Sequence, residues 1–338
     1  MKEFLNLNEE RRRGLLSVID YTEGIQEKAV EKDWWVTLTL KALFTSKYAE
    51  YVVFKGGTSL SKGWNLIHRF SEDIDIALDP IAFGIKYDEN ASKNFIENLK
   101  RKGCEFTTNI LKEELEKQFE AMGIPQEFFT IESAPVDPKN RDKDPQTIYV
   151  KYKSLYDPNP YLPDQVKIEV SVRSQHEPST KVAIQSILSA SRHVSADVYP
   201  VDTFELTCVE PQRTFLEKTF LLHEEFLRKE KEKIKADRMS RHFYDLEKMM
   251  DEEAGKKALQ DDGLYKSIIK HREKYSRLSW VDYATLEKHT INFIPPPELM
   301  DLFKKDYKSM SEEMIYGQAL EFDELMKRME ELQKRFRG

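Results

Sequence analysis

Two aspartates, Asp73 and Asp75, stand two residues apart at the start of the β-rich segment Asp73–Leu78. Because side chains alternate between the two faces of a strand, a strand here places both carboxylates on one face, about 5–7 Å apart. Carboxylate oxygens are preferred ligands of Mg²⁺ and Mn²⁺, which in enzymes also bind substrate phosphates. We therefore predict that Asp73 and Asp75 bind a divalent cation and act in catalysis.

A glycine pair precedes these aspartates and follows the short apolar run Tyr51–Phe54, a pattern typical of a buried strand that ends in a tight turn. Glycine lets the backbone approach a phosphate because no Cβ stands in the way. A helix predicted over Thr58–Leu66 directs its unpaired N–H groups and its positive dipole end toward the same place. The pattern predicts a site for a nucleoside triphosphate (NTP) and its metal ion. The residues expected to hold the phosphates are Gly56, Gly57, Thr58 and Ser59.

The longer pattern FKGGTSLSKGW…HRFSEDIDI joins G-G-[ST], a helix and D-x-D on the next strand. This combination resembles the signature of the polymerase-β-like nucleotidyltransferases. Its extended form resembles the AbiEii/AbiGii-type nucleotidyltransferase toxins, including the MenT toxins. Within this pattern we assign Lys62 and Arg69 to nucleotide binding. Ser71 lies beside Asp73, within reach of the expected metal site, and is assigned to catalysis.

Glu169 is the candidate for a third carboxylate. The segment Val166–Val172 alternates strictly, which places Lys167, Glu169 and Ser171 on one face of a strand. Polymerase-β-like sites complete their metal cluster with an acid from a neighbouring strand, so the resemblance implies that Glu169 is a metal ligand or a general base. The alternative is a glutamate that pairs with Lys167 on a half-solvated strand. The K-x-E-[IV]-S pattern of the toxin family favours the functional interpretation.

Two positions in the second half of the chain match further family motifs. The segment Pro211–Leu222 resembles the one that carries the family's essential lysine, which implies that Lys218 contacts the triphosphate as a compact positive charge. Without the resemblance, a lysine in an apolar helix is usually a surface residue whose charged end reaches solvent.

The second of these positions is Asp245, in a segment that reads R-H-x-x-D where the family has R-D-x-x-D. Asp245 matches the functional aspartate, and His242 replaces the other acid. The alternatives are a structural ion pair between Arg241 and Asp245, which are four residues apart on one helical face, and a packed, neutral histidine.

The elements that position these residues predict an α/β (α+β) fold. The resemblance implies a polymerase-β-like nucleotidyltransferase core with a mixed β-sheet, in a nucleotidyltransferase domain over residues 1–209. That domain comprises N-terminal helices over 1–49 and a catalytic core over 50–209. A helical C-terminal domain over 210–338 would contribute Lys218 and Asp245 to the site. We also predict strands over Thr147–Tyr152 and Val201–Val209, each bounded by turn residues.

Composition limits the classes of function. The chain has 338 residues and a net charge of −7, which argues against a protein that coats nucleic acid non-specifically. Its two cysteines have no metal-like spacing, which fits a reducing cytoplasm and excludes a disulfide framework. No apolar run approaches the ~18–20 residues that span a bilayer, so we expect no membrane partner.

Three stretches are candidates for nucleic-acid contact. Each has an alternative: Trp34 and Trp35 fit core packing, and residues 228–241 fit a solvated charged helix face. The basic-aromatic stretch Gly263–Tyr283 suits RNA stacking, although an amphipathic helix gives the same pattern.

The predicted function is Mg²⁺-dependent (or Mn²⁺-dependent) nucleotidyl transfer from an NTP. The resemblance implies an RNA acceptor, the 3′ end of tRNA, and a cytoplasmic toxin with a separate antitoxin in a toxin–antitoxin or abortive-infection pair. One alternative is a kinase-like phosphotransferase that modifies a protein hydroxyl. Another is a non-catalytic nucleotide-binding module.

Overall fold

The computed structural model describes residues 1–71, 73–137, 139, 141–159 and 162–338, so Glu72 of the motif HRFSEDIDI lies outside the described residues. The chain divides into two compact units. Unit 1 comprises Met1–Gly63 and Phe70–Val209, and unit 2 comprises Trp64–Arg69 and Glu210–Gly338. The chain therefore passes into unit 2 and back between the glycine pair and the aspartate strand.

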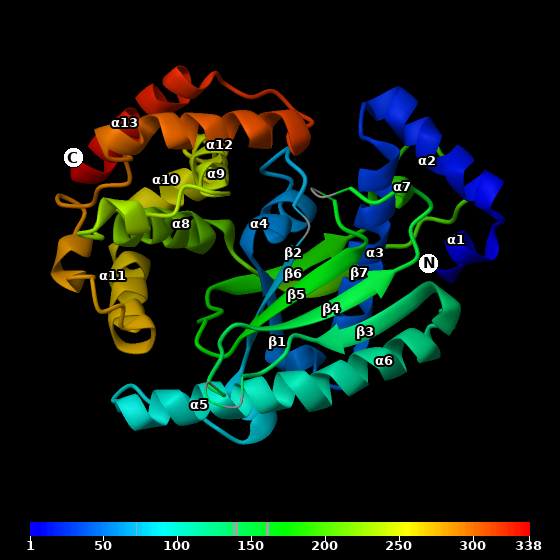
Figure 1. Ribbon diagram of the computed structural model, residues 1–338, viewed down its shortest axis with the longest axis horizontal. Helices are drawn as coiled ribbons and strands as arrows, with labels where there is room; N and C mark the ends of the chain where they lie inside the picture. The colour runs from blue at the N-terminus through cyan, green and yellow to red at the C-terminus, as the bar shows by residue number, and fades with distance from the viewer. Residues whose placement is uncertain (72, 138, 140, 160–161) are drawn as a thin grey trace. The chain divides into compact units, whose positions relative to one another are not determined.

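The described part of unit 1 contains a seven-stranded mixed sheet in the order β3-β4-β5-β2-β1-β7-β6 (Figure 1). Strand β2 pairs antiparallel with β1 and parallel with β5, and β1 pairs parallel with β7. The predicted α/β class with a mixed sheet is confirmed. Strands β3 and β6 have no counterpart in the sequence prediction. The strands are β1 (Val52–Lys55), β2 (Asp73–Leu78), β3 (Phe129–Ser133), β4 (Gln146–Tyr152), β5 (Gln165–Ser171), β6 (Ser179–Ile184) and β7 (Phe204–Val209).

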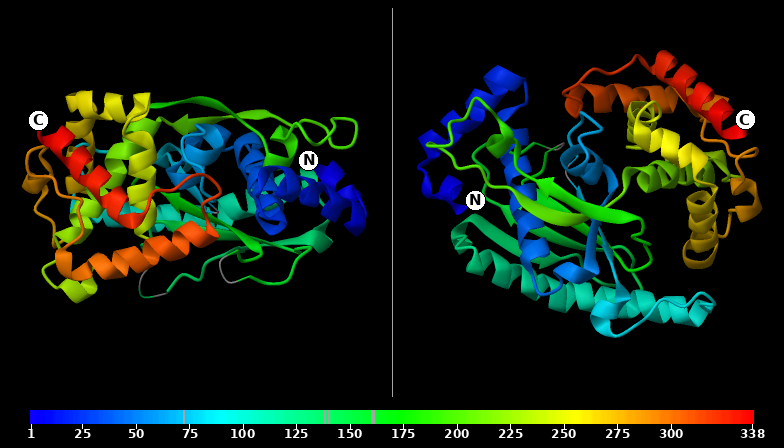
Figure 2. Two further views of the ribbon diagram at one scale, coloured as in Figure 1. Left: turned by 90° about the horizontal axis from the view of Figure 1, so that it is seen from above. Right: turned by 180° about the vertical axis from the view of Figure 1, so that it is seen from behind.

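Helices cover one face of this sheet. The helices of unit 1 are α1 (Lys2–Asn6), α2 (Glu9–Glu23), α3 (Glu27–Thr45), α4 (Gly56–Thr58), α5 (Lys93–Glu105), α6 (Lys112–Ala121) and α7 (Ile187–Ala190). Seen from behind, α3 crosses the sheet (Figure 2, right). A π-helical segment, Phe106–Leu111, joins α5 to α6 in one continuous rod.

The two tryptophans of α3 lie in the core beneath the sheet. Trp34 is 0% and Trp35 1% exposed. The ring of Trp35 stacks on Tyr152 of β4 at 4.9 Å between centroids, and Trp34 donates a hydrogen bond of 2.9 Å to the hydroxyl of Tyr199. The core-packing interpretation is therefore confirmed, because buried rings cannot stack on bases.

Alternation along β2 and β5 separates a buried face from a charged one. Ile74 and Ile168, which are paired across the two strands, are fully buried on the helix-covered side. The intervening residues, among them Asp73, Asp75 and Glu169, are half-buried on the opposite side. Burial of the apolar face thus fixes the face on which the carboxylates lie, because a one-residue slip would reverse both sets.

Unit 2 is helical (Figure 1), and its core contains many aromatic side chains. Its helices are α8 (Pro211–Phe226), α9 (Ser240–Met249), α10 (Glu253–Gln260), α11 (Asp262–His271), α12 (Met300–Glu313) and α13 (Phe322–Arg337). Phe336 of α13 stacks over Phe215 of α8 at 6.3 Å between centroids. The segment Trp64–Arg69 is tied to this unit because the carbonyl of His68 accepts the N–H groups of Tyr316 and Gly317, both at 3.1 Å.

Aromatic side chains of the basic stretch 263–283 pack into this core. Tyr265 and Tyr275 are buried, and Tyr265 donates its hydroxyl to the carbonyl of Leu286. Arg272 forms an ion pair with Glu224 of α8. These contacts favour the amphipathic-helix interpretation over RNA stacking.

None of the helices in the described residues is both long and apolar enough to cross a membrane.

The packing of α5 against the end of β5 yields a stability prediction. An added Cβ on Gly103 would lie 2.5 Å from Cγ1 and 2.7 Å from Cγ2 of Val172, whereas one on Gly14 of α2 would meet nothing within 4 Å. We expect Gly103→Ala to lower the free energy of unfolding by about 1–3 kcal/mol through overpacking. The matched control Gly14→Ala should raise it by about 0.5–1 kcal/mol, since alanine favours helix. Urea titrations followed by circular dichroism measure both, and equal effects would contradict the packing.

Candidate active site

The glycine turn is shaped by the carboxylate next to it. Gly56, directly after β1, has φ +78°, a backbone conformation that side-chain-bearing residues rarely adopt. A Cβ there would lie 2.0 Å from Oδ2 of Asp75. The sequence suggested glycine for close approach to a phosphate, and the structure adds a second reason, because Asp75 occupies the space that any side chain would need.

The helix after this turn is shorter than predicted. It begins at Gly56 rather than Thr58, continues as a π-helical segment over Ser59–Gly63, and ends three residues before the predicted end at Leu66. The prediction for this boundary is wrong because the segment Trp64–Arg69 belongs to unit 2.

Hydroxyl groups tie the turn to the aspartate strand and brace the turn itself. Thr58, fully buried, donates its hydroxyl to the carbonyl of Asp73 and shares a hydrogen bond of 2.9 Å with the hydroxyl of Ser71. Ser59, also fully buried, donates to the carbonyl of Gly56 at 2.8 Å. These bonds fix the turn beside β2, and the predicted phosphate contacts of these residues and of Gly57 stay predictions.

The carboxylates form a row across two strands. The register of β2 and β5 sets Asp73 opposite Lys167 and Asp75 opposite Glu169, and that of β1 and β2 sets Lys55 opposite Asp75. Paired residues of neighbouring strands share a face, so these five side chains lie together. Lys55 was not among the residues predicted from the sequence, although its place directly before the glycine pair was the available signal.

Lys167 lies among these carboxylates as a cation. Its Nζ is 2.7 Å from Oε1 of Glu169 and 4.0 Å from Oδ2 of Asp73. Burial alone would lower the pKa of Lys167, but its hydrogen bond to Glu169 and the charge of Asp73 raise that pKa above its usual value. The pairing of Glu169 with Lys167, left open by the sequence, is therefore observed. It does not by itself decide whether Glu169 also binds a metal.

The donor set fits a hard divalent cation. Asp73 and Asp75 present oxygen ligands from one strand face, and an ammonium group already lies against this row. Among the described residues, no group of three or more His, Cys, Asp or Glu side chains has metal-binding geometry. The residues that would hold a metal ion are Asp73 and Asp75. Glu169 could join them if its ion pair with Lys167 were broken.

Lys62 has a structural partner. Its ammonium pairs with the carboxylate of Asp33 on α3, and the second oxygen of Asp33 accepts the N–H of Ile187 at 2.7 Å. Sequence reasoning missed this pair because Asp33 is distant in the chain. The assignment of Lys62 to nucleotide binding stays a prediction.

In unit 2, a buried cluster forms around Asp245 of α9. Arg69 binds this carboxylate through two hydrogen bonds of 2.7 and 2.8 Å, and Lys218 of α8 lies 2.9 Å from Oδ2. Nδ1 of His242 is 3.4 Å from Nζ of Lys218. Asp245 is thus taken by Arg69 and Lys218 rather than by Arg241, which the sequence had offered as a helical partner. Arg69, assigned to nucleotide binding, lies here.

The electrostatics of the cluster favour ionised Asp245 and neutral His242. Burial alone would raise the pKa of Asp245, but the charges of Arg69 and Lys218 outweigh it and hold that pKa well below its usual value. Burial lowers the pKa of Lys218 against the opposing effect of Asp245. Burial and the charges of Lys218 and Arg241 lower the pKa of His242. With two cations and one carboxylate, the cluster carries one excess positive charge, which suits an anionic ligand.

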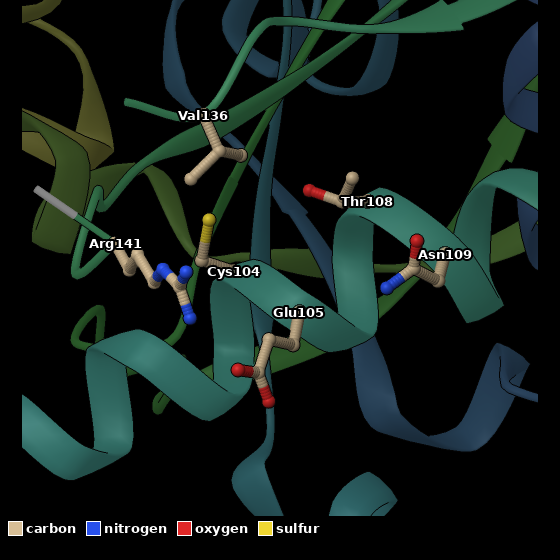
Figure 3. A pocket seen from close by; sticks show the side chains of 6 residues that line it. All are labelled: Cys104, Glu105, Thr108, Asn109, Val136 and Arg141. Carbon is tan, nitrogen blue, oxygen red and sulfur yellow. The ribbon is translucent and has the colours of Figure 1, made fainter. Parts of the chain in front are cut away.

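A cavity of about 290 Å³ lies elsewhere in unit 1, along the helical rod (Figure 3). None of the residues singled out by the sequence lines it. Its lining residues are Cys104, Glu105, Thr108, Asn109, Val136 and Arg141. Burial raises the pKa of the Cys104 thiol, so this sulfur is a poor nucleophile.

A family model described as nucleotidyl transferase AbiEii toxin, Type IV toxin–antitoxin system, matches residues 39–328. This range includes the glycine turn, the carboxylate row and the cluster around Asp245. The chain belongs to the AbiEii nucleotidyltransferase toxin family. A search of curated proteins gave no match.

Membership of the AbiEii family confirms the resemblance and the enzyme class inferred from the motifs. This AbiEii protein is a nucleotidyltransferase and the toxin of a toxin–antitoxin system. The family accordingly implies an NTP substrate and an antitoxin partner.

The contact between Gly56 and Asp75 yields a prediction for this AbiEii enzyme. Gly56→Ala should reduce nucleotidyl transfer at least a hundredfold, because the new Cβ displaces the Asp75 carboxylate. Gly24 is the matched control, since it has φ +69° and nothing within 4 Å of an added Cβ. Gly24→Ala should cost only about 1–2 kcal/mol of backbone strain and leave turnover unchanged. Kinetic assays with thermal unfolding separate the two, and full activity of Gly56→Ala would refute the arrangement.

The buried cluster yields a second prediction. Asp245→Asn should lower the free energy of unfolding by about 3–5 kcal/mol, because it leaves two buried cations without their carboxylate. Asp323, which pairs with Lys304 at the surface, is the control, and Asp323→Asn should change stability by less than about 0.5 kcal/mol.

The same pair of variants has a defined pH dependence. Because the folded-state pKa of Asp245 is lowered, its contribution is complete above the ordinary value of 3.8 and declines as the pH falls below it. The difference between wild type and Asp245→Asn should therefore shrink below about pH 4, as measured by urea titration. A constant difference down to pH 2 would contradict the assigned charge.

Proposed function

We propose that this AbiEii toxin transfers a nucleoside monophosphate from an NTP to an RNA acceptor, the 3′ end of tRNA, with Mg²⁺ or Mn²⁺ as cofactor. The observation that carries the proposal is the carboxylate row, in which Asp73 and Asp75 share a strand face beside a turn that only glycine can make. Nucleotidyl transfer requires that the protein position the substrates and neutralise the charge of the phosphates. We assign these two tasks to the carboxylate row and to the cationic cluster of unit 2.

The covalent chain supports a shared site for the two clusters. Arg69, which holds Asp245, precedes Asp73 by four residues. Four residues of fully extended chain span at most about 14 Å, so the Asp245 cluster is tethered to the aspartate strand whatever the disposition of the units. We propose that Lys218, held by Asp245, binds the triphosphate while Asp73 and Asp75 hold the metal ion.

The reaction places distinct demands on the residues. A hydroxyl oxygen of the acceptor forms a bond to the α-phosphorus, the bond from that phosphorus to the β-phosphate oxygen breaks, and pyrophosphate leaves. A divalent cation at Asp73 and Asp75 would neutralise phosphate charge and lower the pKa of the attacking hydroxyl. Lys218 stabilises the negative charge of the leaving pyrophosphate. Glu169 accepts the hydroxyl proton, and Ser71 bonds a phosphate oxygen.

The resemblance to the MenT-like toxins is the basis for proposing tRNA as the acceptor, a toxin–antitoxin or abortive-infection system, and a separate antitoxin as the partner. Transfer to the tRNA 3′ end blocks aminoacylation and arrests growth, which fits a toxin or an abortive-infection role. A cytoplasmic location is supported by Cys104 and Cys208, which are not joined in a disulfide.

One experiment tests the reaction. The purified protein is incubated with total tRNA and each α-³²P-NTP in turn, with and without Mg²⁺. We expect label on tRNA from at least one nucleotide, and loss of that label when EDTA removes the metal. Asp73→Ala, Asp75→Ala and Lys218→Ala should each reduce labelling at least a thousandfold. Glu132→Ala, which removes an exposed carboxylate from β3, is the control and should label normally.

Other outcomes separate the rival functions. Label transferred to protein from γ-³²P-ATP alone would establish the kinase-like alternative, because only the terminal phosphoryl group then moves. NTP binding without turnover on any acceptor would establish a non-catalytic module. Undiminished labelling by Asp73→Ala would refute the assignment of the carboxylate row.

A further inference from the structure

His242 occupies a specific place in the buried cluster of unit 2. It lies on α9 three residues before Asp245, and its Nδ1 is 3.4 Å from Nζ of Lys218. Both side chains are more than nine-tenths buried. At this distance the ammonium donates and the ring nitrogen accepts, provided that Nδ1 carries no proton.

The surroundings of His242 favour a neutral ring. Burial lowers the pKa of His242 well below its usual value, and the neighbouring charges of Lys218, Arg241 and Arg69 add to this effect against the opposing charge of Asp245. The neutral imidazole keeps one proton. Because the Lys218 ammonium 3.4 Å from Nδ1 can only donate, the contact favours the tautomer that carries this proton on Nε2 and accepts through Nδ1.

The donors of Lys218 can then be counted. An ammonium group has three N–H bonds. Within the described part of unit 2, Asp245 accepts one at 2.9 Å and His242 faces a second at 3.4 Å, which leaves the third for a ligand. Two fixed acceptors restrict the rotation of the ammonium, so the direction of its remaining N–H is determined by the protein.

The charge of the second acceptor also matters. A carboxylate at position 242 would bring the cluster to two cations and two anions. The neutral histidine leaves one positive charge in excess, which favours binding of a polyphosphate. The departure from the family's R-D-x-x-D pattern therefore changes the electrostatics of the site while keeping a hydrogen-bond acceptor.

We propose that His242 is a positioning residue for the nucleoside triphosphate. Its Nδ1, together with Asp245, orients the Lys218 ammonium so that one N–H points at a phosphate oxygen. This inference rests on the proposed role of Lys218 in triphosphate binding. It assigns His242 an action through Lys218 and no contact with the reacting atoms.

The test uses two substitutions that separate packing from hydrogen bonding. His242→Phe keeps the ring and removes the acceptor. His242→Asn leaves more empty space but keeps an oxygen at the position of Nδ1. Tripolyphosphate binding is measured by isothermal titration calorimetry on the full chain, which requires no turnover, and KM for the NTP is measured alongside thermal unfolding.

We expect His242→Phe to weaken tripolyphosphate binding about tenfold or more and to raise KM by a similar factor, because a hydrogen bond to a charged group is lost. His242→Asn should stay within about threefold of wild type in both, although it packs less well. His242→Asp should weaken tripolyphosphate binding by removing the excess charge. Lys218→Met should abolish this binding.

Several results would overturn the inference. Wild-type affinity in His242→Phe shows that no acceptor is needed, and equal losses in the Phe and Asn variants show that His242 serves packing alone. Retention of binding by Lys218→Met removes the group on which His242 is said to act. If the expected binding pattern holds while tRNA receives no label, the RNA proposal fails and the positioning role stands.

Discussion

The ion pair between Arg69 and Asp245 is the interaction on which the organisation of this toxin depends. A carboxylate that is wholly buried must be neutralised, and here one guanidinium and one ammonium do so. Arg69 belongs to the short segment that leaves unit 1 between the glycine turn and the aspartate strand. The motif that looks continuous in sequence is thus divided, with its ends in the sheet and its middle anchored in the helical unit by a buried charge.

In unit 1 the corresponding constraint is steric. Asp75 lies so close to the turn that position 56 has no room for a Cβ, and the positive φ of Gly56 lets the chain pass. The carboxylate row gathers like charges that repel one another. Lys167 offsets that repulsion through Glu169 and Asp73, and Lys55 lies opposite Asp75 on the same face. The AbiEii core therefore combines a tight backbone approach with alternating charge. Both features fit the proposed site for a metal ion and a triphosphate.

Burial decided among the alternatives that composition left open. The tryptophans of α3 and the tyrosines of the basic stretch pack inside their own units, because large rings contribute most when removed from water. Lys218 departs from the usual lysine on an apolar helix, whose ammonium reaches solvent. Its ammonium is instead buried against Asp245. Burial of a charged group costs free energy, which supports the proposed role of Lys218 in binding the triphosphate.

The sequence by itself determined the α/β class, the strand alternation that puts Asp73 and Asp75 on one face, and the family, because these depend on local periodicity and on motifs with fixed spacing. It did not reveal strands β3 and β6, the pairing of Lys62 with Asp33, or the partners of Asp245. Arg69 lies 176 positions before Asp245 and 149 positions before Lys218, so no local sequence pattern connects these residues. The tertiary structure decided which cation met which carboxylate, since the choice depends on the burial and approach of distant segments rather than on the residues beside each charge.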